Sequence, residues 1–195
     1  MSRTSLITRK TNETEIRVSL NLDGSGKAEI STGVGFFDHM LNGFARHGLF
    51  DLTVSVTGDL EVDDHHTIED TGIVIGQAIR EAVGDKKGIR RYGSSILPMD
   101  ETLVMTACDL CGRPYFVFDG SFTSDKMGDM STQMVREFFY AISYAAEMNL
   151  HMRVITGIND HHKAEALFKS FAKTLDAAVS FDPRITDVLS TKGSL

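Results

Sequence analysis

What is scarce in this chain already narrows the classes of protein it can belong to. It has no Trp, 3 Pro and 2 Cys among 195 residues, and no apolar run approaches the roughly 18 residues that a membrane-spanning helix needs. Cys108 and Cys111 have no second CxxC pair beside them, which argues against a disulfide framework or a structural zinc ribbon and fits a reducing compartment. The opening MSRTSLITRKTNETEI holds no apolar stretch of the kind a secretory signal requires. We therefore expect a cytoplasmic protein with no membrane partner.

Positive charge is also in short supply. The 20 Lys and Arg are outnumbered by 27 Asp and Glu, for a net charge of −7, so the chain has no electrostatic reason to bind nucleic acid. Apolar residues make up 42% and charged residues 24%, which is close to the average of globular domains. A chain of this length can bury a core without covalent staples.

The most informative feature is an internal duplication. Asp64-His65-His66-Thr67-Ile68-Glu69 returns as Asp160-His161-His162-Lys163-Ala164-Glu165, and an apolar helical pattern follows each copy. Residues 54–58 align with 153–157, and the strand that begins at Glu13-Thr14 aligns with the one that begins at Glu101-Thr102. Because the matches keep their order along the chain, duplication of a whole unit explains them better than chance.

Each half has the pattern β-β-α-β-α. Alternation and turn residues predict strands and helices at 15–22, 27–32, 36–47, 50–57 and 64–83 in the first half. The second half is predicted to have strands at 101–109, 114–119 and 150–156, a helix capped by Ser131 and a helix capped by Asp160 that Pro183 stops. Asp64 is the predicted cap of its own helix. Residues 5–9 are expected to add a strand to the first sheet, and residues 90–95 are interpreted as a junction.

This order of elements predicts an α+β fold in which sheets lie outside and helices pack between them. We expect a single compact domain over residues 1–195, made of two pseudo-symmetric halves of about 1–93 and 94–195.

Both HHxxE segments fall on the first turn of a helix. His65 and His66 lie four and three residues before Glu69, so each shares a helix face with that carboxylate. Consecutive histidines point about 100° apart, and each His of a pair is therefore expected to bind a different metal ion. A single HHxxE is most often a solvated helix start, but two copies in duplicated register favour metal binding.

The duplication adds one more ligand to each set. His39 precedes the first HHxxE by about the same distance as Glu137 precedes the second, on equivalent helices. The candidate metal ligands are His39, His65, His66, Glu69, Glu137, His161, His162 and Glu165. Nitrogen and oxygen donors without thiolate suit Mn²⁺ or Fe²⁺, with Zn²⁺ as an alternative.

These same residues carry a family resemblance that covers essentially the whole chain. The sequence resembles the imidazoleglycerol-phosphate dehydratases, and the family often has His where this chain has Glu137 and Ser where it has Cys111. The matching stretches are Arg9 to Thr14, Gly35 to Leu41, His47 to Leu52, Gly58 to Asp70, Pro98 to Glu101, Asp109 to Pro114, Asn159 to Glu165 and Ser190 to Gly193.

The resemblance implies a hydro-lyase of histidine biosynthesis. Such an enzyme converts imidazole glycerol phosphate to imidazole acetol phosphate and water, and the proton it removes is not acidic. The imidazole ring, held as an imidazolate between two Mn²⁺ per subunit, would act as the electron sink. The resemblance further implies halves similar to the second domain of ribosomal protein S5, and trimers assembled into a 24-subunit shell.

The resemblance also implies roles for particular residues. It places Glu13 against the substrate as the proton shuttle, and Glu165 is the second catalytic candidate. The positions that match the family's phosphate-binding residues are Arg91, Arg113, Lys169, Ser190 and Lys192. Taken singly, each of these five would be interpreted as a solvated surface group. Lys169 is a stronger candidate than the rest, because it follows His161 by eight residues on nearly the same face of one helix.

Two functions of other kinds remain open at this point. A metal-storage or structural shell would explain the HHxxE turns but not Glu13 or the clustered cations. A dimetal phosphatase would use the same metals on the phosphate itself, and would release inorganic phosphate rather than a ketone.

Overall fold

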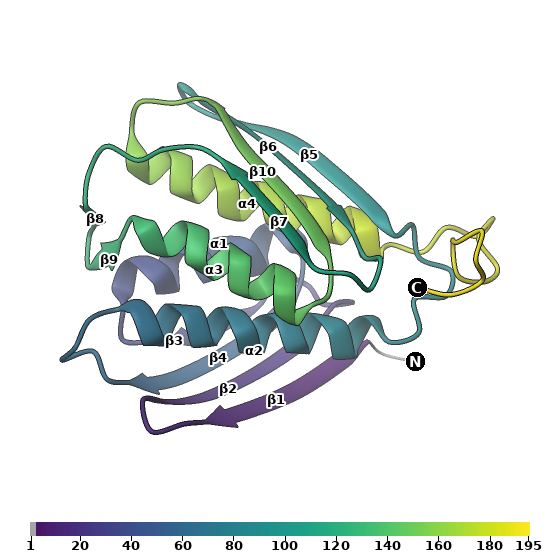
Figure 1. The fold of residues 1–195 in the computed structure, drawn as a ribbon, viewed down its shortest axis with the longest axis horizontal. Helices are drawn as coiled ribbons and strands as arrows, with labels where there is room; N and C mark the ends of the chain where they lie inside the picture. Colours follow the sequence, from purple (N-terminus) through teal and green to yellow (C-terminus); the bar gives the residue numbers. More distant parts are fainter. Residues whose placement is uncertain (1–2) are drawn as a thin grey trace.

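Two four-stranded sheets form the outer layers of the protein and four helices lie between them, as Figure 1 shows for residues 3–195, the part that this computed structural model describes. None of the helices in this range combines the length and apolar character that a transmembrane segment requires.

The two halves share one topology. The first sheet has the order β1-β2-β4-β3 and the second β5-β6-β10-β7, and in each the last-named strand runs parallel to its neighbour while the other pairs are antiparallel. The elements of the first half are β1 (Thr4–Lys10), β2 (Thr14–Asn21), β3 (Ala28–Ser31), α1 (Gly35–Gly48), β4 (Asp51–Gly58) and α2 (His65–Val83). Those of the second half are β5 (Tyr92–Met99), β6 (Thr102–Asp109), β7 (Tyr115–Asp119), the short hairpin β8 (Lys126–Met127) and β9 (Met130–Ser131), α3 (Gln133–Ala145), β10 (Asn149–Thr156) and α4 (Asp160–Val179).

The helices pair across the halves rather than within them. α2 packs along α3, and α1 packs along α4. The α2–α3 approach is close because α2 carries glycine at the contact: a Cβ on Gly72 would lie 2.8 Å from the carbonyl oxygen of Phe138. Each helix pair therefore brings together side chains that are far apart in the sequence.

A cluster of phenylalanines fills the space where α1, α3 and α4 meet. The rings of Phe138 and Phe168 stack with centroids 5.2 Å apart, and Phe37 meets Phe138 edge-on at 5.1 Å. All three side chains are at most 2% exposed. Burial of side chains of this size is the main driving force that joins the halves.

The predicted fold class is confirmed, with sheets outside and helices between, but each half begins with one more strand than the β-β-α-β-α pattern. Residues 5–9 do form a strand, as expected. The interpretation of residues 90–95 as a junction is wrong, because β5 runs through Tyr92–Met99. Glycine and proline make β5 hard to recognise as a strand from its sequence. Gly93 is required because a Cβ at this position would lie 1.9 Å from the Thr174 carbonyl oxygen. Pro98 is tolerated because β5 is an edge strand.

Of the three predicted helix caps, only Asp64 occupies the N-cap position expected for it, at the start of α2. Its carboxylate makes no capping bond there and instead accepts hydrogen bonds from the backbone N–H and the hydroxyl of Ser131. α4 is capped by Asn159 rather than Asp160, and α4 ends at Val179, short of Pro183. Thr132, not Ser131, precedes α3. The carboxylates of Asp64 and Asp160, which local rules predict to cap helices, form hydrogen bonds to residues distant in the sequence instead.

Asp160 also binds donors from a distant segment instead of capping its own helix. Its carboxylate accepts from the backbone N–H groups of Thr123 and Ser124 and pairs with the buried ammonium of Lys163 at 2.9 Å. Burial alone would raise the pKa of Asp160, but these bonds hold it well below its usual range. The first turn of α4 is thereby tied to the loop that follows β7.

Candidate metal centre

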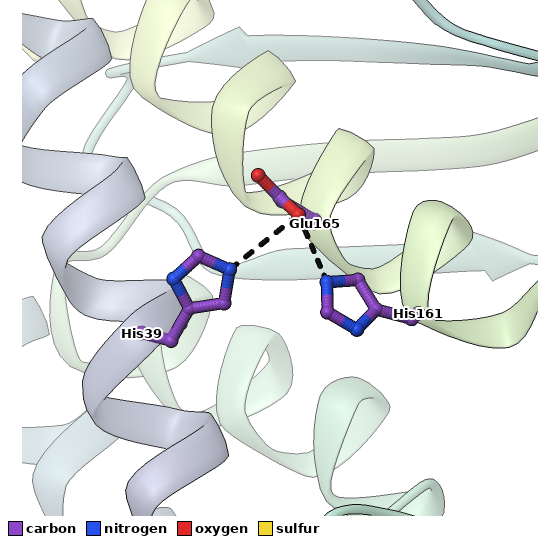
Figure 2. Close-up of side chains that lie close together, drawn as sticks. All are labelled: His39, His161 and Glu165. Atoms are coloured by element: carbon purple, nitrogen blue, oxygen red, sulfur yellow. Dashed lines mark hydrogen bonds and ion pairs between the residues drawn. The ribbon is translucent and has the colours of Figure 1, made fainter.

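Three side chains from the two halves converge between α1 and α4. His39 comes from α1, His161 and Glu165 come from α4, and Figure 2 shows both rings turned toward the carboxylate. Glu165 Oε2 lies 3.0 Å from His161 Nε2 and 3.5 Å from His39 Nε2. One donor atom of each residue falls within 4.8 Å of the others.

Lys169 completes this cluster one helical turn after Glu165. Its Nζ lies 2.7 Å from Glu165 Oε1, so the two carboxylate oxygens have different neighbours, one cationic and one facing the histidines. Burial would raise the pKa of Glu165, but the bond to Lys169 and its charge lower it. The carboxylate is therefore ionised and can act as a metal ligand.

The donor set fits the metal that the sequence predicts. Two imidazole nitrogens and one carboxylate oxygen lie within 4.8 Å of one another, no thiolate is among them, and the rings of His39 and His161 are about half exposed. Such a set suits Mn²⁺, Fe²⁺ or Zn²⁺ and leaves coordination positions for further ligands.

The corresponding residues of the other helix pair are less tightly gathered. His65 and Glu69 of α2 lie 3.7 Å apart at their nearest nitrogen and oxygen. Glu137 projects from the neighbouring α3, where its carboxylate pairs with Arg136 at 2.6 Å. These three residues occupy the pseudo-symmetric counterpart of the first cluster.

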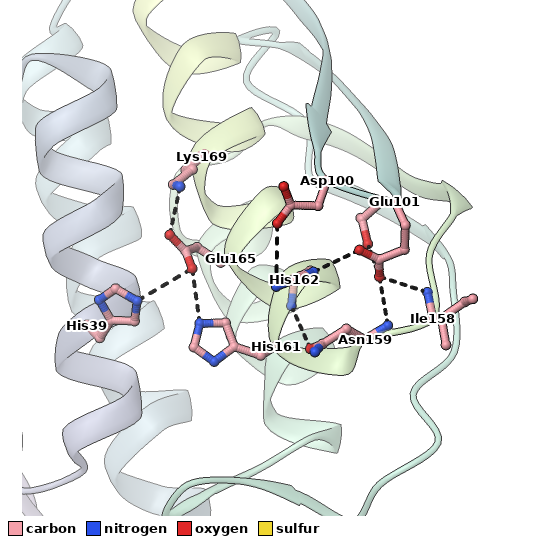
Figure 3. A network of polar contacts seen from close by, with 10 residues as sticks. His39, Asp100, Glu101, Ile158, Asn159, His161, His162, Glu165 and Lys169 are labelled. Carbon is pink, nitrogen blue, oxygen red and sulfur yellow. Dashed lines mark hydrogen bonds and ion pairs between the residues drawn. The ribbon is translucent and has the colours of Figure 1, made fainter.

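The second histidine of each HH pair is bound to carboxylates outside these clusters. His66 Nδ1 lies 2.9 Å from Asp59, and His162 Nδ1 lies 2.8 Å from Glu101, the latter visible in Figure 3. These hydrogen bonds raise the pKa of both imidazoles. The pKa of Glu101 is held far below its usual range, first by the backbone N–H of Asn159 and then by His162.

Glu13 stands at the entrance to β2 with a half-exposed carboxylate. Its Oε1 comes within 3.8 Å of His66 Nε2, which is longer than a hydrogen bond. The candidate proton shuttle thus lies beside one of the candidate ligands.

Four of the five candidate phosphate-binding residues line one cavity. Arg91, Arg113, Ser190 and Lys192 line an open space of about 870 Å³ that is bordered by the C-terminal segment. Arg91 donates two hydrogen bonds to Asp109, and these raise the pKa of Arg91. It donates a third to the Leu189 carbonyl. Two of its five N–H donors remain for an anion. Lys169 lies apart from these residues, in the histidine cluster.

Sequence reasoning missed three carboxylates next to the candidate ligands. Glu101 and Asp100 contact His162, and Asp59 contacts His66. Glu101 could have been found, because it is the duplicated counterpart of Glu13. Asp59 carries no such signal, since its counterpart in the second half is Ile158.

Histidine and carboxylate side chains from both halves of a duplicated α+β scaffold lie close together between α1 and α4, and several cationic side chains line a separate cavity. This combination is typical of enzymes that act on anionic substrates. Comparisons with known proteins point to a single family. The family model of imidazoleglycerol-phosphate dehydratase matches residues 32–175. A protein of that name from Lachnoclostridium phytofermentans is 62% identical over all of both chains, and one from Acetivibrio thermocellus is 58% identical over the same extent.

Solved structures agree. The Staphylococcus aureus imidazoleglycerol-phosphate dehydratase superposes with a TM-score of 0.83 at 39% identity, covering 92% of this chain and 99% of that one. The Pyrococcus furiosus enzyme gives 0.84 at 33% identity, covering 97% and 100%. The chain belongs to the imidazoleglycerol-phosphate dehydratase family and is a hydro-lyase of histidine biosynthesis. The resemblance inferred from sequence motifs is confirmed.

Proposed function

We propose that this enzyme dehydrates imidazole glycerol phosphate to imidazole acetol phosphate with the help of two Mn²⁺ per subunit. The observation that carries the proposal is the convergence of His39, His161 and Glu165 from separate halves of the chain. His65, Glu69 and Glu137 are the candidate ligands of the equivalent position, and His66 and His162 complete the set. When bound, the metals supply positive charge that stabilises an anionic imidazole ring.

The chain's own carboxylates move the proton. Loss of the hydroxyl next to the ring and of a proton from the neighbouring carbon gives an enol, which becomes the ketone on reprotonation. Glu13 is suited to accept and return that proton because its carboxylate is half exposed and not committed to a close ion pair. Glu165 is ionised beside Lys169, and is better suited to hold a metal than to exchange a proton.

The phosphate end of the substrate has its own group of donors. Arg91, Arg113, Ser190 and Lys192 line one cavity, where arginine can form paired hydrogen bonds to phosphate. Lys169 contacts Glu165 in the histidine cluster, and in this proposal it would contact the substrate from the metal side.

The distance between these two groups supports an oligomer. The Arg91 backbone N–H bonds to Ala178 near the end of α4, about 20 Å along the helix axis from Glu165. A small substrate cannot bridge that span within one chain, so the cavity of one copy is expected to meet the histidine cluster of another. We infer a homo-oligomer, built from trimers into 24 subunits as the family resemblance implies.

The outer face of the second sheet carries exposed apolar side chains, since Ile96, Tyr115 and Ile155 are 65%, 60% and 44% exposed. In an oligomer, a second copy of the chain would cover side chains of this kind. The two free buried cysteines fit a reducing compartment, and we place the enzyme in the cytoplasm.

The test is a product assay on metal-depleted protein with and without added Mn²⁺. We expect Mn²⁺ to restore formation of a ketone that keeps its phosphate. Release of inorganic phosphate would favour a dimetal phosphatase, and metal uptake without turnover of this substrate would favour a storage shell.

A further inference from the structure

The second histidine of each HH turn is held in the same way. His66 Nδ1 lies 2.9 Å from Asp59 Oδ2, and His162 Nδ1 lies 2.8 Å from Glu101 Oε2. An ionised carboxylate can only accept, so each Nδ1 carries the hydrogen and donates. In the neutral ring the lone pair is then on Nε2, which is the atom free to bind a metal.

The two carboxylates that do this do not occupy equivalent positions. The equivalent of Glu101 is Glu13, since Thr14 sits opposite Gly58 in the first sheet and Thr102 lies beside Gly157 in the second half. The residue after Gly58 is Asp59, whereas the residue after Gly157 is Ile158. In the first half the carboxylate that contacts the histidine is therefore Asp59, directly after Gly58. In the second half it is Glu101, directly before Thr102.

We propose that Glu101 is a positioning residue that fixes His162 with Nε2 outward, and that Asp59 performs this task for His66 and so leaves Glu13 free for proton transfer. This inference rests on the proposed function, in which both histidines are metal ligands and Glu13 carries the proton.

The surroundings of the two glutamates support different roles. Glu101 Oε1 accepts the backbone N–H of Asn159 at 2.8 Å and of Ile158 at 3.1 Å, while Oε2 meets His162. Figure 3 shows this carboxylate bridging the loop before α4 and the imidazole. Glu13, by contrast, approaches His66 only at 3.8 Å and its side chain is 53% exposed. Glu101 is immobilised on both oxygens, and Glu13 is not.

Glu101→Gln separates orientation from capping. The single amide oxygen is retained by the two backbone donors, which leaves the amide N–H₂ facing His162 Nδ1. Two donors cannot face each other, so Nδ1 must become the acceptor and Nε2 must carry the hydrogen. We expect the ¹⁵N shifts of His162 in the metal-free full chain, labelled on histidine and measured by solid-state NMR, to exchange between the two ring nitrogens.

Metal affinity provides the second readout. Loss of an outer-shell partner typically weakens metal binding 10- to 100-fold, and we expect a loss of this size for Mn²⁺ at one site of Glu101→Gln, measured by titration calorimetry. Thermal stability should stay near that of the parent protein, because the bonds to Ile158 and Asn159 survive.

The duplication supplies matched controls. Glu13→Gln, at the equivalent position, should change neither the His66 nor the His162 shifts. Asp59→Asn should alter His66 alone. Adding Ile158→Asp to Glu101→Gln places a carboxylate where the first half has one, and should restore the original His162 tautomer and most of the Mn²⁺ affinity; Ile158 is 82% exposed and accepts the change.

Unchanged His162 shifts in Glu101→Gln would overturn the proposal, as would exchanged shifts with undiminished Mn²⁺ binding. His162→Ala tells this failure from a failure of the proposed function. If His162→Ala loses a metal while Glu101→Gln binds normally, the ligand assignment stands and the positioning role is wrong. If His162→Ala keeps both metals, the ligand assignment itself is wrong.

Discussion

Individual carboxylates in this protein differ in role because they differ in neighbours. Glu13 lies in the bend just before β2, and Glu15 lies two residues further on, within β2. Glu15 is paired with Lys10, while Glu13 faces His66 across 3.8 Å. Chemistry is therefore expected from Glu13 and not from Glu15.

The first prediction at this scale concerns Glu13→Gln. The amide keeps the shape of the side chain but cannot exchange a proton, so turnover should fall about 100-fold or more while Mn²⁺ binding is retained. Steady-state kinetics and metal analysis check this, with Glu15→Gln as the control that should keep its activity. A Glu13→Gln enzyme of near-normal turnover would remove Glu13 from the mechanism.

Glu137 offers a second residue-scale test. It projects from α3, which packs against α2, the helix that carries the candidate ligands His65 and Glu69. Its carboxylate pairs with Arg136. Glu137→Ala should empty or weaken one of the two metal sites and His39→Ala the other, and Glu137→His should restore binding because imidazole is an equally competent ligand. Two fully occupied sites in purified Glu137→Ala would make Glu137 an ordinary helix residue.

At the scale of elements, the contact between α2 and α3 depends on missing side chains. A Cβ on Gly72 would lie 2.8 Å from the Phe138 carbonyl oxygen and 2.9 Å from the Ala141 Cβ. Gly72→Ala should force the helices apart and cost about 1–3 kcal/mol of unfolding free energy. Gly43→Ala in α1 meets nothing within 4 Å and should stabilise by about 0.5–1 kcal/mol. Urea unfolding of both variants checks the opposite signs, and equal effects would contradict this account.

The N-terminus of α1 is capped from the other half of the chain. Asp129 accepts from the backbone N–H groups of Gly35 at 2.6 Å and Phe36 at 2.9 Å. Burial would raise the pKa of Asp129, but these two bonds lower it. Because α1 carries His39, this cap links the loop after β8 to the position of a candidate ligand.

Asp129→Ala should therefore lower the unfolding free energy by about 1 kcal/mol at neutral pH. A carboxyl whose pKa is lower in the folded state stabilises the protein above its unfolded pKa, about 3.9, and the benefit is lost as pH falls through the folded value. The difference between parent and variant should be constant from pH 7 to 5 and shrink below about pH 4. Denaturant unfolding across this range decides, and a difference that grows on acidification would contradict the cap.

At the scale of the whole molecule, the candidate metal ligands and the cavity lie at different places on one chain. The cavity is bounded by the C-terminal segment, whereas the histidine cluster lies near the start of α4. If the cavity of one copy meets the histidine cluster of another, the candidate metal ligands lie close to the contact between subunits. Bound metal would then help to hold the oligomer together.

Removal of metal should then dissociate the oligomer. We expect chelation to convert a large particle into small oligomers in sedimentation velocity, and added Mn²⁺ to rebuild it. The control is a chelator already saturated with Mn²⁺, which should leave the particle intact. An unchanged profile after verified metal removal would show that metal does not drive assembly.

The duplication, the fold class and the two HHxxE turns can all be predicted from patterns along the chain. These depend on short-range periodicity: apolar residues at helical or alternating spacing, and histidine and glutamate within one turn of each other. His161 and Glu165 accordingly lie together as their spacing predicts, and the family resemblance rests on the same local motifs.

Which distant segments come into contact depends on tertiary packing, and local patterns do not predict it. The pairing of α1 with α4 and of α2 with α3 depends on how buried faces fit, through Phe138 and Gly72, and that brings His39 to Glu165. The partners of Asp64, Asp160 and Glu101 are likewise long-range, because a buried or clustered carboxylate binds whichever donors the fold presents rather than those that local capping rules favour. Strand β5 could not be predicted for a similar reason: its glycine and proline are permitted by contact with α4 and by its place at a sheet edge, and neither is visible along the chain.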